Sequence, residues 1–197
     1  MLTKLKIFAD FIEIKIEVND VLRGAVYTPQ QLPIVKEAQD ELNVNPIHVQ
    51  TSSFYDVYAG KICAALDRQH PRDLFDIHMF LNDHEIDRKL MDCFLIYLIS
   101  GSRPIHEILN PNMIDINQSF LNEFSGMTPT EIKDTTLFEA RTKLVTLINK
   151  KLTNTDKQFL LSFKSGTPDW SLINIKNTQD FPAIKWKLLN ISKKWTL

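Results

Sequence analysis

The sequence predicts an α+β protein, because segments that alternate between apolar and polar residues precede a long region of helical periodicity. Residues 4–27 carry the alternation, most clearly in the run IEIKIEV at 12–18. A period of two places the apolar side chains on one face of a strand. From residue 54 onward, apolar residues recur every three or four positions, which is typical of amphipathic helices. The 197 residues, 44% of them hydrophobic, are enough to bury a sizeable core.

Composition excludes several functional classes. The net charge of −1 provides no overall attraction to nucleic acid or membrane, so any contact with RNA must come from a local patch. Cys63 and Cys93 lie in apolar helical contexts, which predicts core residues in a reducing compartment. No signal peptide precedes the first strand, and no apolar run approaches the roughly 20 residues that span a bilayer. We therefore expect a cytoplasmic protein.

Further short elements follow the alternating segment. Arg23-Gly24 allows a turn or bulge, and residues 28–45 form a connector with a short helix. Residues 47–49 predict one more strand. Beyond Leu81, helices are expected from a cap at Asn82 or Asp83 through Ile99. The later expected helices are 105–109, 130–152 and 155–163.

Residues 54–81 are the most chemically loaded stretch of the chain. Two helical patterns meet here at Pro71, and proline is tolerated in the first turn of a helix. The apolar stripe of the first pattern is Tyr55, Ala59, Ile62, Cys63 and Leu66. The charged residues on either side of the break are Lys61, Arg68, Arg72, Asp73 and Asp76.

These charged residues have two interpretations. Arg72 and Asp76 have the i, i+4 spacing of an ordinary surface ion pair, worth a few tenths of a kcal/mol, and Lys61 could be a solvated lysine. Alternatively, basic and acidic groups from both helices converge at the helix–helix corner and form a site.

Residues 61–76, KICAALDRQHPRDLFD, closely resemble the signature of the AbiEii family. These are nucleotidyltransferase-like toxins of bacterial abortive-infection and toxin–antitoxin systems, which defend against phage. Their third and fourth motifs are a lysine-led helix ending in arginine, then Arg-Asp-x-x-Asp. The resemblance implies that Lys61 contacts nucleotide phosphates and that Asp76 completes or orients the catalytic centre. The nucleotide-binding or supporting residues that it implies are Arg68, Arg72 and Asp73.

The resemblance extends to the segment before this signature and to the C-terminus. IKIEVN at 14–19 is similar to the strand of the family's second motif, whose acid would be Glu17, a nucleotide-binding residue and metal ligand. The alternative is a solvent-facing glutamate on an amphipathic strand. The implied fold is a partial nucleotidyltransferase-type β-sheet with packed helices in residues 1–82, including the lysine helix packed on the sheet. A mostly helical domain in residues 83–197 would follow it.

The family's first motif, a Gly-Gly or Gly-Ser followed by D-x-D, is not found in this sequence. Its five glycines are isolated, and Gly101-Ser102 with Asp115-Ile116-Asn117 lacks the second acid and follows the lysine helix. Alternate residues of a strand share a face, so a D-x-D pair suits the metal ions of nucleotidyl transfer. The resemblance therefore implies Mg²⁺ as cofactor, but with an incomplete site in this chain.

The C-terminal block, GTPDW and DFPAIKWKLLNI, also resembles the family. Trp170, Trp186 and Leu188 are predicted to be packing anchors, because their neighbours are also apolar. The densest basic cluster is Lys185, Lys187, Lys193 and Lys194. A solvated helix face is the default interpretation of this cluster, with contact to an RNA backbone as the alternative.

The functional prediction is an AbiEii-type toxin homologue, truncated or degenerate, whose family activity transfers a nucleotide from an NTP to a tRNA-like RNA. The alternative is a non-catalytic module that binds nucleotide or RNA, or that docks on an antitoxin. Implied partners are an NTP, RNA and an antitoxin, without a membrane. A homodimer through the exposed sheet edge is also expected, because an open edge invites pairing.

Overall fold

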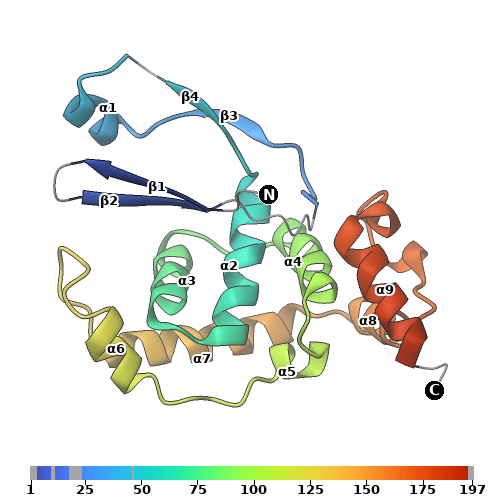
Figure 1. Ribbon diagram of the computed structural model, residues 1–197. Helices are drawn as coiled ribbons and strands as arrows, with labels where there is room; N and C mark the ends of the chain where they lie inside the picture. Colours follow the sequence, from blue (N-terminus) through green and yellow to red (C-terminus); the bar gives the residue numbers. More distant parts are fainter. Residues whose placement is uncertain (1–3, 10–11, 18–23, 46, 195–197) are drawn as a thin grey trace.

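The computed structural model describes residues 4–9, 12–17, 24–45 and 47–194, with Ala9, Glu17 and Lys194 described by backbone alone. The fold is α+β, as predicted: two small antiparallel hairpins and a larger group of helices. In Figure 1 the hairpins lie one above the other, on the side of the helical group where α2 begins.

The first hairpin confirms the predicted alternation. Strand β1, Lys4–Ala9, pairs with β2, Ile12–Glu17, with Ile7 opposite Ile14 and Lys6 opposite Lys15. This register places the leucine and the isoleucines of the hairpin on one face, and Phe8 on the other face with the charged residues. The leucine and isoleucine face is exposed to solvent, and its described members are Leu5, Ile7, Ile12, Ile14 and Ile16.

The second hairpin is separate from the first. Strand β3, Gln30–Pro33, pairs with β4, His48–Thr51, and helix α1, Lys36–Leu42, lies between them in the chain. The helix and β4 were predicted. Strand β3 was not, because QQLP has neither alternation nor β-branched residues.

The lysine helix and its neighbour form the predicted pair. Helix α2, Phe54–Arg68, is capped by Ser53, and α3, Pro71–Asp83, begins at the proline. The prediction that the lysine helix packs on a sheet is wrong. Helix α2 packs mainly against α3 and α4 (Arg88–Ser100), because its apolar stripe meets other apolar helix faces.

The predicted start of α4 is also wrong. Asn82 and Asp83 end α3, and the cap of α4 is Asp87, whose carboxylate accepts from the backbone N–H of Leu90 at 2.7 Å. Several aspartates precede this helix, and local pattern alone did not distinguish between them. The remaining elements are α5 (Ile105–Leu109), α6 (Asn117–Glu123), α7 (Asp134–Lys151), α8 (Asn154–Lys164), η1 (Trp170–Leu172), η2 (Thr178–Asp180) and α9 (Pro182–Lys194).

One hydrophobic core runs through the helical group from Ala59 to Ile184, and every buried side chain among the described residues lies at Ser53 or later. A domain boundary at residues 82 and 83 stays a prediction.

Trp170 packs against Phe159 and Phe163, as predicted. Trp186 is not a packing anchor, because 59% of it is exposed on α9.

Candidate functional site

The centre of the candidate site is an ion pair between the two helices of the signature. The Lys61 ammonium on α2 contacts a carboxylate oxygen of Asp76 on α3. Both side chains stay accessible, with 43% and 36% of their surface exposed. Lys61 is therefore not an isolated solvated lysine, and Asp76 is paired across the two helices rather than with Arg72.

A second ion pair joins the two helices nearer the corner. Arg68, in the last turn of α2, lies 2.8 Å from a carboxylate oxygen of the buried Asp73. The guanidinium of Arg72 donates instead to the backbone carbonyl of Glu123, at 3.1 and 3.2 Å. The structure thus brings Lys61 and Asp76 together and aims Arg72 away, toward the end of α6.

Gln69 fixes the corner between the two helices. It is buried and adopts a left-handed backbone conformation, with φ of 51°. Its side chain donates to the carbonyl of Asn112 and accepts from Ile114 N–H and from the guanidinium of Arg141. Such a network of buried hydrogen bonds holds the backbone in one conformation, so the angle between α2 and α3 is set by groups far away in the sequence.

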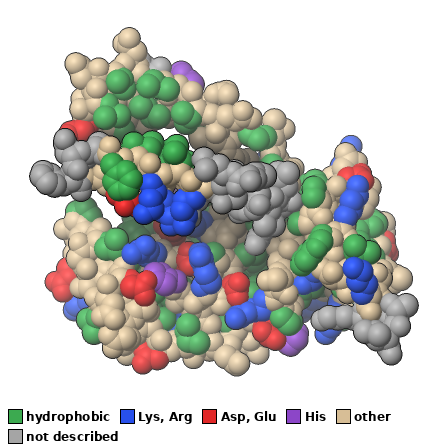
Figure 2. Space-filling model, in the orientation of Figure 1, with side chains coloured by type: hydrophobic (Ala, Val, Ile, Leu, Met, Phe, Trp, Pro, Cys, Tyr) green, Lys and Arg blue, Asp and Glu red, His purple; other side chains and the backbone are tan. Residues whose placement is uncertain are grey.

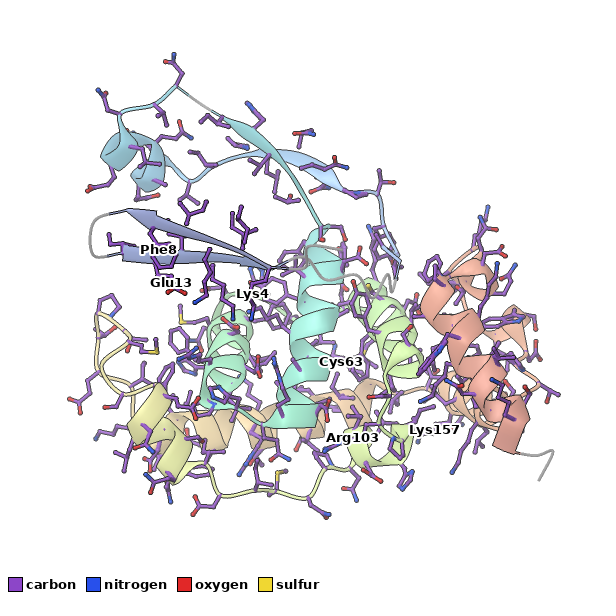
Figure 3. All side chains as sticks on the ribbon, in the orientation of Figure 1. Lys4, Phe8, Glu13, Cys63, Arg103 and Lys157 are labelled. Carbon is purple, nitrogen blue, oxygen red and sulfur yellow. The ribbon has the colours of Figure 1, made fainter. Side chains whose placement is uncertain are left out.

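The polar face of the first hairpin lies across from these helices. Figure 3 shows Lys4, Phe8 and Glu13 on the side of the hairpin that faces α3 and α6. In Figure 2, lysine and arginine side chains lie on both sides of the hollow between the first hairpin and the helices. Glu13 is already paired with Lys6, at 2.7 Å. The backbone of Glu17 ends β2, while its side chain lies outside the described part of the structure, and its predicted role stays a prediction.

A cavity of about 520 Å³ borders the same helix on its other side, between α2, α4 and α5. Gly60, Cys63 and Arg68 line it from α2, and Arg103 lines it from the segment before α5. Arg103 lies 2.9 Å from a carboxylate oxygen of Asp67. Sequence reasoning missed Arg103, because no motif spacing links it to the signature.

Sequence reasoning also missed Asp56, which attaches the N-terminal segment to α2. It is 2% exposed and accepts the backbone N–H groups of Val26 at 2.7 Å and Tyr27 at 3.0 Å. The hydroxyls of Ser53 and Tyr97 donate to it as well, at 2.6 and 3.1 Å. The only local signal was the Ser-x-x-Asp spacing of a helix start, which does not reveal the bonds to residues 26 and 27.

The described residues do not fit a complete magnesium site. No group of three or more His, Cys, Asp or Glu side chains comes together among them. Asp76 and Asp73 are each occupied by a cation of the chain itself. The Mg²⁺ prediction therefore depends on the nucleotidyltransferase family, and the roles of the signature residues stay predictions.

The charged residues of the signature lie on α2 and α3, and two ion pairs, Lys61–Asp76 and Arg68–Asp73, join these helices. The sequence profile of the family described as "Nucleotidyl transferase AbiEii toxin, Type IV TA system" matches residues 3–189. This chain therefore belongs to the AbiEii nucleotidyl transferase toxin family, as the resemblance implied. No curated protein and no solved structure gives a significant match. In the part of the chain that the structure describes, no helix combines the length and apolarity of a membrane span.

Proposed function

We propose that this chain supplies the phosphate-binding part of a nucleotidyltransferase site that transfers a nucleotide from an NTP to an RNA acceptor. The observation that carries the proposal is the accessible pair of Lys61 and Asp76. An exposed ion pair contributes only about 0–1 kcal/mol, so a triphosphate can displace the carboxylate from the lysine at little cost. Lys61 then neutralises phosphate charge, and the released Asp76 becomes free to act at the reacting centre.

The acids that hold Mg²⁺ come, in this proposal, from a further segment or a second polypeptide. The family membership and the absence of D-x-D among the 197 residues support this. Mg²⁺ would stabilise the attacking and leaving oxygens of in-line transfer. The residues of this chain bind the nucleotide and orient it: Lys61 at the phosphates, with Arg68 and Asp73 bracing the two helices beside it.

Lys61→Ala should weaken NTP binding by at least about tenfold, the typical cost of one lost charge-assisted contact. Calorimetric titration of the full chain with each of the four NTPs, with and without Mg²⁺, measures this directly. Lys150→Ala, which removes an exposed lysine from the last turn of α7, is the matched control and should bind like wild type. Equal affinities of wild type and Lys61→Ala would exclude Lys61 from nucleotide binding.

Asp76→Asn separates binding from transfer. Asparagine removes the negative charge that competes with the phosphates for Lys61, so NTP affinity should equal or exceed that of wild type. Transfer of an α-labelled nucleotide to host RNA, in a mixture that supplies the metal-binding acids, should fall by about a hundredfold or more. Loss of NTP affinity in Asp76→Asn would show that this carboxylate supports binding instead.

The second candidate is a binding module that docks on an antitoxin without catalysis. The family belongs to toxin–antitoxin systems, and α1 with its flanking segments exposes large apolar side chains, Val35, Leu42 and Ile47. Exposed apolar groups of this kind often mark protein interfaces. This candidate predicts NTP or RNA binding without product, together with a stoichiometric complex with the antitoxin encoded beside the gene. A labelled RNA product that depends on Lys61 would favour the enzyme instead.

A further inference from the structure

Strand β2 has an outer edge that no other described strand covers. β1 and β2 form a two-stranded sheet, and each makes its main contacts only with the other. Ile12, Ile14 and Ile16 of β2 are 45–64% exposed. A lone two-stranded hairpin is marginally stable in water, and an uncovered apolar edge is a template for another strand.

The sequence of β2 is complementary to itself. When two β2 strands run antiparallel and centre on Ile14, Ile12 of one strand lies opposite Ile16 of the other, and the two Ile14 residues meet. In the same register Glu13 lies opposite Lys15 twice, once on each side of the centre. Opposite charges directly across two strands stabilise the pairing, and like charges destabilise it.

Other registers of β2 against itself lose this match. Moving the centre to Lys15 places lysine against lysine and Glu13 against Glu17, while moving it to Glu13 places two glutamates together. Any shift by a single residue sets apolar side chains against polar ones, because the faces alternate. Charge and apolarity therefore select one register, centred on Ile14.

The other sheet edges in the described structure lack this property. An antiparallel pair of β1 strands centred on Leu5 would place Lys4 opposite Lys6, and lysines are a common protection of edge strands. Strand β3 ends in Pro33, which cannot donate a ladder hydrogen bond. Only the β2 edge combines apolar residues with charges that neutralise each other across a two-fold axis.

We propose that β2 is a homodimer interface, in which a second copy of this chain adds its own β2 antiparallel at Ile14 and makes a four-stranded sheet in the order β1-β2-β2-β1. The contact is isologous, as two-fold symmetry requires. Its axis runs perpendicular to the sheet, so the polar faces of both hairpins lie on the same side. The two candidate sites then face a common side of the dimer.

A charge exchange tests the interface. Glu13→Lys or Lys15→Glu alone turns both attractive contacts into like-charge contacts and should raise the dimer dissociation constant at least about tenfold. The double variant Glu13→Lys/Lys15→Glu restores complementarity and should return to within about threefold of wild type. Sedimentation velocity over a concentration series measures each constant, and circular dichroism checks the fold. Glu37→Lys, the same charge change on exposed α1, is the control.

A cysteine scan tests the register without using charge. Under mild oxidation, Ile14→Cys should form a disulfide-linked dimer, because the two residues at this position meet at the axis. Ile16→Cys should not exceed the wild-type background from Cys63 and Cys93, because it faces Ile12. A monomeric wild type at the highest soluble concentration would overturn the proposal. So would a double variant as weak as the single ones, or equal cross-linking at residues 14 and 16.

Discussion

Asp56→Asn should lower the free energy of unfolding by about 3–4 kcal/mol, because its buried donors lose a carboxylate that serves all of them. Val26 and Tyr27 donate to different oxygens of the carboxylate. An asparagine has one acceptor oxygen, so its NH₂ group would point hydrogens at one of these two N–H groups. Burial first, and the Asp56 charge second, raise the pKa of the Tyr97 hydroxyl, so it stays a donor throughout the useful pH range. Denaturant unfolding followed by circular dichroism measures the change.

Asp40→Asn makes the same chemical change on the exposed surface of α1 and should alter stability by less than about 0.5 kcal/mol. Hydrogen exchange gives a second readout for Asp56→Asn: the amides of Val26 and Tyr27 should exchange much faster than those of α4. If the free energy of unfolding of Asp56→Asn lies within about 1 kcal/mol of the wild-type value, Asp56 does not hold the N-terminal segment on α2.

Asp156→Asn should lower the free energy of unfolding by about 2–3 kcal/mol at neutral pH, because it removes one charged partner from a partly buried ion-pair network. Arg88, at the start of α4, donates two hydrogen bonds to Asp156, at 2.8 and 2.9 Å, and also contacts Asp92. Asp156 in turn completes a capping box with Thr153 at the start of α8. The carboxylate therefore links the beginnings of two helices that lie 68 residues apart in the chain.

The effect of Asp156→Asn should depend on pH in a defined direction. Burial alone would raise the pKa of the Asp156 carboxyl, but hydrogen bonds from Arg88 and Thr153 hold the pKa below its ordinary value of 3.8. A carboxyl group whose pKa is lower in the folded state than in the unfolded state stabilises the protein at pH values above its unfolded-state pKa. This contribution disappears as pH falls through the folded pKa.

The free-energy difference between wild type and Asp156→Asn should thus stay constant from pH 7 to about pH 5 and shrink below pH 4. Unfolding curves at several pH values measure it. Asp180→Asn breaks a solvent-exposed pair with Lys185 and should cost less than about 0.5 kcal/mol at every pH. A difference that grows as the pH falls toward 3 would contradict the assignment.

Local pattern was sufficient where one stretch of chain determines the structure. The apolar stripe of residues 55–66 and the proline at 71 specify α2 and the start of α3. The alternation at 12–17 specifies β2 and the face on which its isoleucines lie. In each case, neighbours within one or two turns contain the whole signal.

Pairings between distant segments could not be predicted in this way. Sequence spacing predicted an ion pair between Arg72 and Asp76 on one helix. In the structure, the packing of α2 against α3 places Asp76 in an ion pair with Lys61 instead. The hydrogen bonds that Asp56 accepts from residues 26 and 27 cross a longer stretch of chain, 30 and 29 residues compared with 15 for Lys61 and Asp76. Separation of the strands into two hairpins also depends on tertiary contacts, because each strand pattern is compatible with a single larger sheet.

The corner at Gln69 and His70, between α2 and α3, limits which insertions and deletions the protein can tolerate. Only Gln69 and His70 connect α2 to α3, so inserting or deleting one residue between Arg68 and Pro71 would displace α3 relative to α2 and separate Asp76 from Lys61. The buried hydrogen bonds of Gln69 prevent the corner from accommodating such a change in length. The loop of residues 126–131, which is largely exposed, has no such constraint. Length variants of this chain should therefore accumulate in that loop, while the spacing from residue 61 to 76 stays fixed.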